Sequence, residues 1–298
     1  MHNTILTADS GSTSTNWALV SEKGLEKQIN TGGINPYYMS VDEIRQIVMQ
    51  ELLPPLSQAE RESIREIHFY GSGCSTPAKI QLIAQALSTI SPNASIFAGH
   101  DVLASARAAC GRGKGIACIL GTGSNSCVYD GKNILKNAIS LGYFLGDEGS
   151  GLHIGKLFLI RYLKNQLSPE LKQATDAHFH YSFEDILNGI YQQDKPNRFI
   201  APFSRFILDH ALEYPDLTAI VRQSFTEFVR EYIRPFPEAE SYPICFVGSV
   251  AYLMRDILCE VFAHEGYAVT RIVRYPIEGL ITYHQQQLLQ NHPTTNQL

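Results

Sequence analysis

The sequence of 298 residues lacks any apolar run near the roughly 20 residues that a membrane-spanning helix needs. Its net charge is only −5, which argues against nucleic acid or an anionic membrane as the main partner. Residues 1–4 lead directly into an expected strand, without the features of a signal peptide. We therefore expect a soluble, cytoplasmic protein that binds neither nucleic acid nor membrane.

Cysteine is also scarce, and none of the six cysteines has the paired CxxC spacing of a zinc or redox site. They lie in segments with an apolar or helical pattern, which favours reduced core thiols over disulfides or metal ligands. We therefore expect no metal site built from cysteine and histidine. The cysteines are Cys74, Cys110, Cys118, Cys127, Cys245 and Cys259.

Apolar residues make up 44% of the chain and charged residues 18%, as in a soluble globular protein. The length suits two domains, because single cores stop growing at about 250–300 residues. Expected strands alternate with expected helices, which predicts an α/β fold with parallel strands flanked by helices. We place an N-terminal lobe at residues 1–112 and a C-terminal lobe at 113–283. The remaining residues, 284–298, form a helix end and tail that can pack back on the N-terminal lobe.

Residues 116–130 have the pattern of a β-hairpin whose tip consists of small side chains and backbone N–H groups. Two glycines let a ligand approach the backbone, and four polar residues, the last of them Ser126, add hydroxyl and amide donors. Such a tip can bind phosphate, although the same pattern suits an ordinary polar turn. The tip residues are Gly121, Thr122, Gly123, Ser124 and Asn125.

The N-terminal segment 5–20 repeats this order of apolar run, small-residue turn and apolar run. Residues 9–14 align without gaps on residues 121–126, which indicates an internal duplication. Two such tips suggest two lobes that grip one polyphosphate from opposite sides. Only the first tip carries a carboxylate, Asp9, which suits a hydrated Mg²⁺ that bridges phosphate oxygens.

Asp101 follows an expected strand at 95–98 and begins an expected helix at 101–110. Aspartate is a preferred N-cap residue and needs no chemistry to explain it there. However, ligands of open α/β sheets gather beyond the carboxyl ends of strands, where Asp101 lies. Its carboxylate could therefore orient and deprotonate a substrate hydroxyl, with His100 as a local hydrogen-bonding residue.

A glycine-rich stretch, residues 141–151, precedes an expected helix at 152–167 and contains the adjacent acids Asp147 and Glu148. Acids in the first turn would suit the helix dipole. Four glycines within ten residues instead imply close approach by a ligand, and adjacent carboxylates can accept hydrogen bonds from vicinal sugar hydroxyls. The helical segment 168–237 has a packing pattern, and we assign no chemistry to it.

Gly248 and Ser249 follow an expected strand at 244–247 and open a helix over 251–264. The N-terminus of a helix favours an anion, and a flat ring can lie against a glycine at that position. This turn therefore joins the two hairpin tips and the glycine-rich stretch as a candidate ligand contact.

Four motifs resemble, in this order, the phosphate-1, phosphate-2, sugar-contact and adenosine motifs of N-acetylglucosamine kinases. Those enzymes belong to the BadF/BadG/BcrA/BcrD-type ATPase group of the actin, hexokinase and sugar kinase superfamily. The resemblance extends from residue 5 to about residue 285. It implies two ribonuclease H-like (actin-like ATPase) lobes, each a mixed sheet flanked by helices, with a nucleotide cleft between them. The motifs are Asp9-Ser-Gly-Ser-Thr13, Gly121-Thr-Gly-Ser-Asn125, Gly146-Asp-Glu-Gly-Ser150 and Val247-Gly-Ser-Val250.

The resemblance implies a role for each matched position. Asp101 resembles the catalytic base, and Asp9 resembles the residue that organises Mg²⁺ through water. Gly248 and Ser249 resemble the turn on the adenosine side. The residues that resemble ATP phosphate contacts are Asp9, Gly11, Ser12, Thr13, Ser14, Gly121, Thr122, Gly123, Ser124 and Asn125. Those that resemble sugar contacts are Asn35, Asp101, Thr122, Gly142, Tyr143, Asp147 and Glu148.

The resemblance therefore implies a kinase that uses ATP and Mg²⁺ to phosphorylate an amino sugar, with N-acetylglucosamine as the first expectation. Family members that phosphorylate this sugar tend to show Trp-Gly-His where this chain has Leu141-Gly142-Tyr143. The acceptor stays open among N-acetylglucosamine, glucosamine, N-acetylmuramate and glucose, and a homodimer also stays open.

Two other functions stay open. ATPase activators of 2-hydroxyacyl-CoA dehydratases share the group, but they place cluster-binding cysteines in the second lobe. This sequence has no cysteine between Cys127 and Cys245. A sugar or nucleotide sensor that binds its ligands without turnover would carry the same motifs as a kinase.

Overall fold

The computed structural model describes residues 3–11 and 13–291, and within them the chain forms two compact units. Unit 1 contains the N-terminal part up to Gly113, residues 131–133 and the part from Tyr275 onward. Unit 2 contains Lys114–Asp130 and Ile134–Arg274. From the sequence we placed residues 113–283 in one lobe, whereas unit 2 ends at Arg274 because the last helix packs on elements of unit 1.

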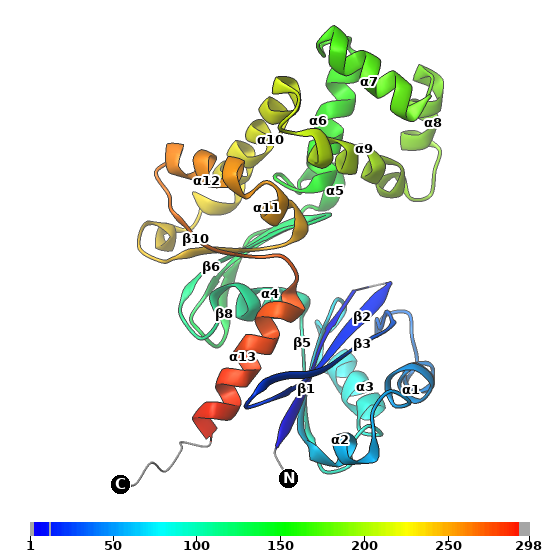
Figure 1. Ribbon diagram of the computed structural model, residues 1–298, viewed down its shortest axis with the longest axis vertical. Coiled ribbons are helices and arrows are strands. Elements are labelled where there is room, and N and C mark those ends of the chain that lie inside the picture. Colours follow the sequence, from blue (N-terminus) through cyan, green and yellow to red (C-terminus); the bar gives the residue numbers. More distant parts are fainter. Residues whose placement is uncertain (1–2, 12, 292–298) are drawn as a thin grey trace. The chain divides into compact units, whose positions relative to one another are not determined.

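Unit 1 is a five-stranded sheet with helices on both faces (Figure 1). Its helices begin at clear caps: the hydroxyl oxygens of Ser40 and Ser57 accept from backbone N–H groups three residues on, and Glu43 and Glu60 complete the capping boxes. The elements are β1 (Thr4–Ser10), β2 (Ser14–Ser21), β3 (Gly24–Gly32), α1 (Val41–Ile47), the π-helical turn η1 (Val48–Leu52), α2 (Gln58–Ser63), β4 (Ile64–Gly71), α3 (Pro77–Leu87), β5 (Ser95–Gly99), α4 (Asp101–Cys110) and α13 (Pro276–Asn291).

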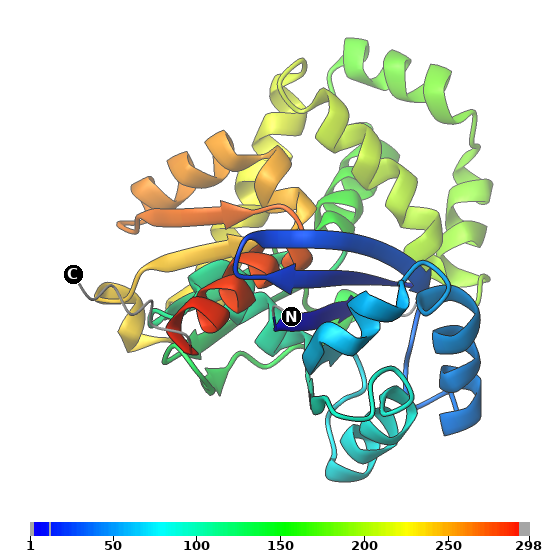
Figure 2. The same ribbon diagram turned by 60° about the horizontal axis from the view of Figure 1, so that its bottom comes forward.

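The sheet of unit 1 has the strand order β3-β2-β1-β4-β5. β2 is antiparallel to both β1 and β3, while β4 is parallel to β1 and β5 is parallel to β4. Alternate side chains face opposite layers: Leu6 and Trp17 join the core beneath α1 and α3, whereas Ala18 contacts Ile277 of α13. α13 lies against β1, β2 and α4, as both ribbon views show (Figures 1 and 2).

Unit 2 repeats this topology, with the strand order β8-β7-β6-β9-β10 and the same pattern of parallel and antiparallel pairs. Its larger core joins one face of the sheet to α6 and α9–α12. The elements are β6 (Gly115–Leu120), β7 (Ser124–Tyr129), β8 (Ile134–Asn137), α5 (Gly142–Leu145), α6 (Gly151–Leu163), α7 (Pro169–Phe179), α8 (Phe183–Tyr191), α9 (Pro196–His210), α10 (Pro215–Phe228), η2 (Val229–Ile233), η3 (Pro237–Glu240), β9 (Ile244–Val247), α11 (Ser249–Leu253), α12 (Arg255–His264) and β10 (Val269–Val273).

The expected α/β fold, with one mixed sheet in each half, is confirmed. The ungapped alignment of the two tips is wrong, because Ser10 pairs with Thr15 whereas Leu120 pairs with Ser124. The first turn is therefore one residue longer, and Gly11, not Asp9, occupies the place of Gly121.

Smaller expectations about the elements and thiols also need correction. The helix expected over 251–264 is broken at Met254 into α11 and α12. The short helices α2 and α5 were not predicted, although Ser57 and Glu60 give α2 the sequence signature of a capping box. All six cysteines lie within the described residues as free thiols, but Cys259 is exposed and Cys110 is only partly buried. No helix among residues 3–11 and 13–291 is both long and apolar enough to span a membrane.

Candidate active site

The carboxyl ends of β1, β3, β4 and β5 lie in one row at the same end of the unit 1 sheet, because these strands run in the same direction. We refer to this row of strand ends as the edge of the sheet. Asp9 stands near the end of β1, Asn35 follows β3, and Asp101 follows β5. The structure therefore brings together three of the predicted site residues on a single edge, where ligands of open α/β sheets gather.

Asp9 and Asp101 influence each other electrostatically. Burial, and secondarily the negative charge of Asp101, raises the pKa of Asp9 from 3.8 to about 6. A carboxylate held at this edge with a second carboxylate near it is a place that favours a cation. The side chain of Asp101 is 41% exposed, so a substrate hydroxyl can reach it.

Asp101 is the first residue of α4 and not its N-cap, so the capping explanation for this residue is wrong. The N-cap is His100, whose Nδ1 lies 3.3 Å from the backbone nitrogen of Val102 and 2.6 Å from Oδ1 of Asp101. A carboxylate only accepts, so the shorter contact requires a proton on Nδ1, and we assign the hydrogen bond to Asp101. This bond raises the pKa of His100.

Ser10 joins the first turn to the loop that carries Asn35. Its hydroxyl lies 2.7 Å from Oγ1 of Thr15, donates to the carbonyl of Ile34 at 3.1 Å, and lies 3.1 Å from the nitrogen of Ile34. Oδ1 of Asn35 accepts from the N–H of Tyr37 at 2.9 Å, which fixes the direction of the amide. Ser10 was not among the predicted site residues.

The tip of the first hairpin is open to solvent. Gly11, Thr13 and Ser14 are exposed, and the N–H of Gly11 donates to the carbonyl of Ser14 at 3.0 Å. Ser12, the remaining predicted phosphate contact of this tip, lies outside the described residues.

In unit 2 the second tip meets the start of α6 and the turn at Gly248. The N–H groups of Gly151 and Leu152 donate to the carbonyls of Gly121 and Thr122, at 2.9 and 3.3 Å. Gly248 has a φ of +131°, and a Cβ there would lie 2.2 Å from the carbonyl oxygen of Leu120, so only glycine fits. The phosphate-2 and adenosine motifs, including Ser249 at the start of α11, are thus neighbours in one unit.

Asp147 faces the second tip. A Cβ on Gly123 would lie 3.1 Å from its carboxylate, and the N–H of Ser124 donates to its Oδ1 at 3.4 Å. Asp147 adopts a φ of +60°, and its N–H donates to the hydroxyl of Tyr232 at 3.3 Å. Burial raises the pKa of Asp147. Ser124 is itself buried, and the Oδ1 of Asn125 accepts from the N–H of Ser126.

Glu148 points to different surroundings. It lines a pocket of about 630 Å³ together with Leu141, Gly146, Glu231 and Tyr232. Both acids precede Ser150, the N-cap of α6, so they do not form an acidic first turn and that alternative is wrong. Gly142 and Tyr143 lie in α5, and the carbonyl of Tyr143 accepts from Nζ of Lys156.

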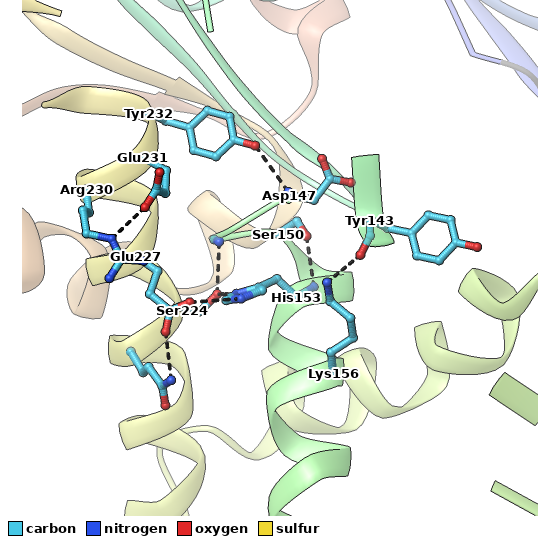
Figure 3. A network of polar contacts seen from close by, with 12 residues as sticks. Tyr143, Asp147, Ser150, His153, Lys156, Ser224, Glu227, Arg230, Glu231 and Tyr232 are labelled. Atoms are coloured by element: carbon cyan, nitrogen blue, oxygen red, sulfur yellow. Dashed lines mark hydrogen bonds and ion pairs between the residues drawn. The ribbon is translucent and has the colours of Figure 1, made fainter. Parts of the chain in front are cut away.

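Sequence reasoning missed the polar side chains that support this loop (Figure 3). His153 of α6 and Ser224 of α10 are buried and bond each other, and Glu227 lies beside them. Tyr232 belongs to η2. The sequence pattern of residues 168–237 predicts no chemistry, because the spacing of residues on one helix face is the same whether their side chains pack in a core or form hydrogen bonds.

The residues present fit the ATP and Mg²⁺ that the motifs imply. Burial, and secondarily the charge of Asp101, raises the pKa of Asp9, and a hydrated cation beside it would favour the ionised carboxylate. The exposed first tip leaves small side chains free to approach phosphate oxygens. Among the described residues no group of three or more His, Cys, Asp or Glu side chains could hold a metal ion. A single carboxylate such as Asp9 can bind a hydrated Mg²⁺ through its water ligands.

Solved structures identify the class of protein to which this fold belongs. A Chromobacterium violaceum protein, provisionally named N-acetylglucosamine kinase, is 19% identical with a TM-score of 0.70 over 95% of this chain and 99% of its own. A Listeria monocytogenes protein, provisionally named N-acetylmannosamine kinase, is 12% identical with a TM-score of 0.51 over the same shares. Both proteins are less than 25% identical to this chain, so these likenesses show a shared α/β fold alone.

The family follows from a nearer relative. A Porphyromonas gingivalis protein, provisionally named N-acetylglucosamine kinase, is 40% identical with a TM-score of 0.84 over 95% of this chain and 99% of its own. The chain belongs to the N-acetylglucosamine kinase-like members of the BadF/BadG/BcrA/BcrD-type ATPase family. Comparison with protein-family models and with curated proteins gave no match.

Proposed function

We propose that this protein is a sugar kinase that transfers the γ-phosphoryl group of ATP to a hydroxyl of an amino sugar, with N-acetylglucosamine as the acceptor. The observation that carries the proposal is the carboxylate pair of unit 1. Asp9 stands near the end of β1 and Asp101 follows β5, the two parallel strands on either side of β4, and the charge of Asp101 contributes to the raised pKa of Asp9. The name of the P. gingivalis relative supports the choice of sugar.

In the proposed reaction Asp101 accepts a hydrogen bond from the sugar hydroxyl, orients it toward the γ-phosphorus and takes its proton. The new P–O bond forms as the bond from the γ-phosphorus to the β–γ bridging oxygen breaks, and ADP leaves with that oxygen. His100, bonded to Asp101, holds this carboxylate in place. Asp9 would hold Mg²⁺ through water, and the ion would neutralise phosphate charge when bound. The backbone and small side chains of the two tips contribute donors to the phosphates.

Asp101→Asn tests the role of the base. We expect sugar-dependent ADP release to fall by about 10²–10⁴-fold, the usual contribution of a general base, while ATP binding stays near the wild-type value. A coupled assay measures the release of ADP, and calorimetry measures ATP affinity. Full turnover in this variant would remove Asp101 from the proposed role.

The acceptor is tested with a panel of N-acetylglucosamine, glucosamine, N-acetylmuramate and glucose in the same assay. We expect the highest kcat/KM for N-acetylglucosamine. If ATP binds but no sugar is phosphorylated, the protein is a sensor and the kinase proposal fails.

A further inference from the structure

One face of α6 carries two polar side chains, His153 and Lys156, that act on opposite ends of the segment 143–149 (Figure 3). This segment consists of the last residues of α5 and the turn that follows, and we refer to it as the loop 143–149. Lys156 donates from Nζ to the carbonyl of Tyr143, at the start of the loop. His153 contacts Ser224, and the hydroxyl oxygen of Ser224 accepts from the N–H of Gly149 at 3.1 Å, at the end of the loop. A single helix face therefore holds the loop that carries Asp147 and Glu148.

The direction of the hydrogen bonds around His153 follows from its partners. Its Nε2 lies 3.2 Å from Oε2 of Glu227, a carboxylate that only accepts, so Nε2 carries a proton. The side chain of His153 is 10% exposed, and loss of hydration lowers the pKa of His153. Lys156 lowers this pKa further, and Glu227 and Glu148 oppose the shift, but burial has the largest effect.

A neutral ring with its proton on Nε2 has a bare Nδ1. This nitrogen lies 2.8 Å from the hydroxyl oxygen of Ser224, which must therefore donate to it. The same oxygen accepts from Gly149. Ser224 is fully buried, so its hydroxyl has no water to replace either partner.

The far side of the ring is also anchored. Oε1 of Glu227 accepts from Nε2 of Gln223 at 2.8 Å, and Oε1 of Gln223 accepts from Arg161 at 2.8 Å. Together with Ser224 these contacts form one chain of hydrogen bonds between α6 and α10, whose donors converge on the carboxylate of Glu227 from Arg161 on one side and from the loop on the other.

The loop needs such support because its backbone is unusual. Asp147 has a φ of +60° and Gly149 a φ of +81°, so two residues out of three are left-handed. A Cβ on Gly149 would lie 2.8 Å from side-chain atoms of Leu120 and of Phe228. Such a turn persists only where its surroundings fix it.

We propose that His153, acting through Ser224, is a positioning residue that holds Asp147 and Glu148 in the orientation that binds the acceptor sugar. This inference rests on the proposed function, because it assigns the loop 143–149 to sugar recognition. Lys156 fixes the other end of the same loop.

Two substitutions of His153 separate the two edges of its ring. In His153→Asn, the amide oxygen can take the place of Nδ1 and accept from Ser224. In His153→Gln, the longer amide can reach Glu227 but leaves Ser224 without its acceptor. We expect the KM for sugar to stay within about threefold of wild type in His153→Asn and to rise about tenfold or more in His153→Gln. The KM for ATP should change little in either variant.

Ser224→Ala removes one oxygen and should raise the sugar KM as much as His153→Gln does. The double variant should then be no worse than either single variant, since both break the same chain. Circular dichroism and thermal unfolding verify that each variant is folded. If His153→Gln does not fold, the sugar KM of Ser224→Ala is compared with that of His153→Asn instead. Equal sugar KM values for the Asn and Gln variants, or additive effects in the double variant, would overturn the proposal.

The same experiment separates this inference from the proposed function. If wild-type protein phosphorylates no sugar, the proposed function fails, and dissociation constants of N-acetylglucosamine measured by calorimetry replace KM in the comparison. Absence of sugar binding to wild-type protein would overturn the inference as well.

Discussion

Asp9 sets a pH dependence that can be measured without any ligand. Its pKa rises from 3.8 to about 6 on folding, so the folded chain binds this proton more tightly than the unfolded chain. The contribution of Asp9 to the free energy of unfolding is therefore fully present below about pH 4 and is lost as the pH rises through about 6. Asn does not titrate, so the free energy of unfolding of Asp9→Asn lacks this pH dependence. Between pH 4.5 and pH 7.5 we expect it to rise relative to that of wild type by about 1–2 kcal/mol.

Urea unfolding at the two pH values, with a chelator present to remove divalent cations, measures this gain. A difference between Asp9→Asn and wild type that stays constant with pH would show that Asp9 titrates alike in both states.

The same scale shows what the sequence can predict about a site. The position of Asp101 after a strand was sufficient to place it at the row of strand ends, whereas Asp9, expected in the hairpin tip, is the last residue but one of β1. His153 and Ser224 were missed because each stands on a helix, with the spacing of ordinary packing residues. Their role depends on a contact across 71 positions of sequence, which a local pattern does not contain.

At the scale of elements, the periodic strands and helices were predicted well and the short or broken ones were not. β1 and β2 follow from two apolar runs on either side of a small-residue turn. α5 is only four residues long, and the break between α11 and α12 falls at Met254, where neither glycine nor proline marks it. Tertiary packing decides such boundaries, since α11 contacts β6, β9 and β10.

The crossing of α13 with α4 gives the prediction at this scale. A Cβ on Gly279 would lie 2.4 Å from the carbonyl oxygen and 2.5 Å from the Cα of Ala108. Alanine usually stabilises a helix interior by about 1 kcal/mol relative to glycine, but overpacking against backbone costs about 1–3 kcal/mol or more. We therefore expect Gly279→Ala to lower the free energy of unfolding, as measured by urea titration.

The matched control is Gln286→Ala, at an exposed position of the same helix, which should change stability by less than about 0.5 kcal/mol. A Gly279→Ala protein as stable as the control would show that α13 does not approach α4 this closely in solution.

At the scale of the whole molecule, two units with one topology have come to carry different chemistry. Unit 1 has its two interacting carboxylates at the ends of β1 and β5. The corresponding edge of unit 2 has the second tip, the loop with Asp147 and the turn at Gly248. If both tips contribute donors to ATP phosphates, a substitution in either tip must lower the affinity for ATP.

This expectation can be tested at two positions where the ligand-free fold has room for a side chain larger than that of glycine. A Cβ on Gly11 would lie 3.7 Å from the carbonyl oxygen of Ser14, and one on Gly121 would meet no atom within 4 Å. Gly11→Val and Gly121→Val should therefore fold normally while placing a branched side chain where a phosphate would approach. ATP at one hundred times its Kd stabilises the folded state by about 2.7 kcal/mol, and a tenfold weaker affinity loses about half of that gain.

Thermal unfolding with and without ATP and Mg²⁺ measures this stabilisation in each variant. Gly113→Val, at an exposed turn outside both tips, is the control and should keep the full gain. We expect both tip variants to lose at least half of it while their melting temperatures without ligand stay near that of wild type. A loss confined to one tip would assign the phosphate contacts to that unit and leave the other tip as an ordinary polar turn.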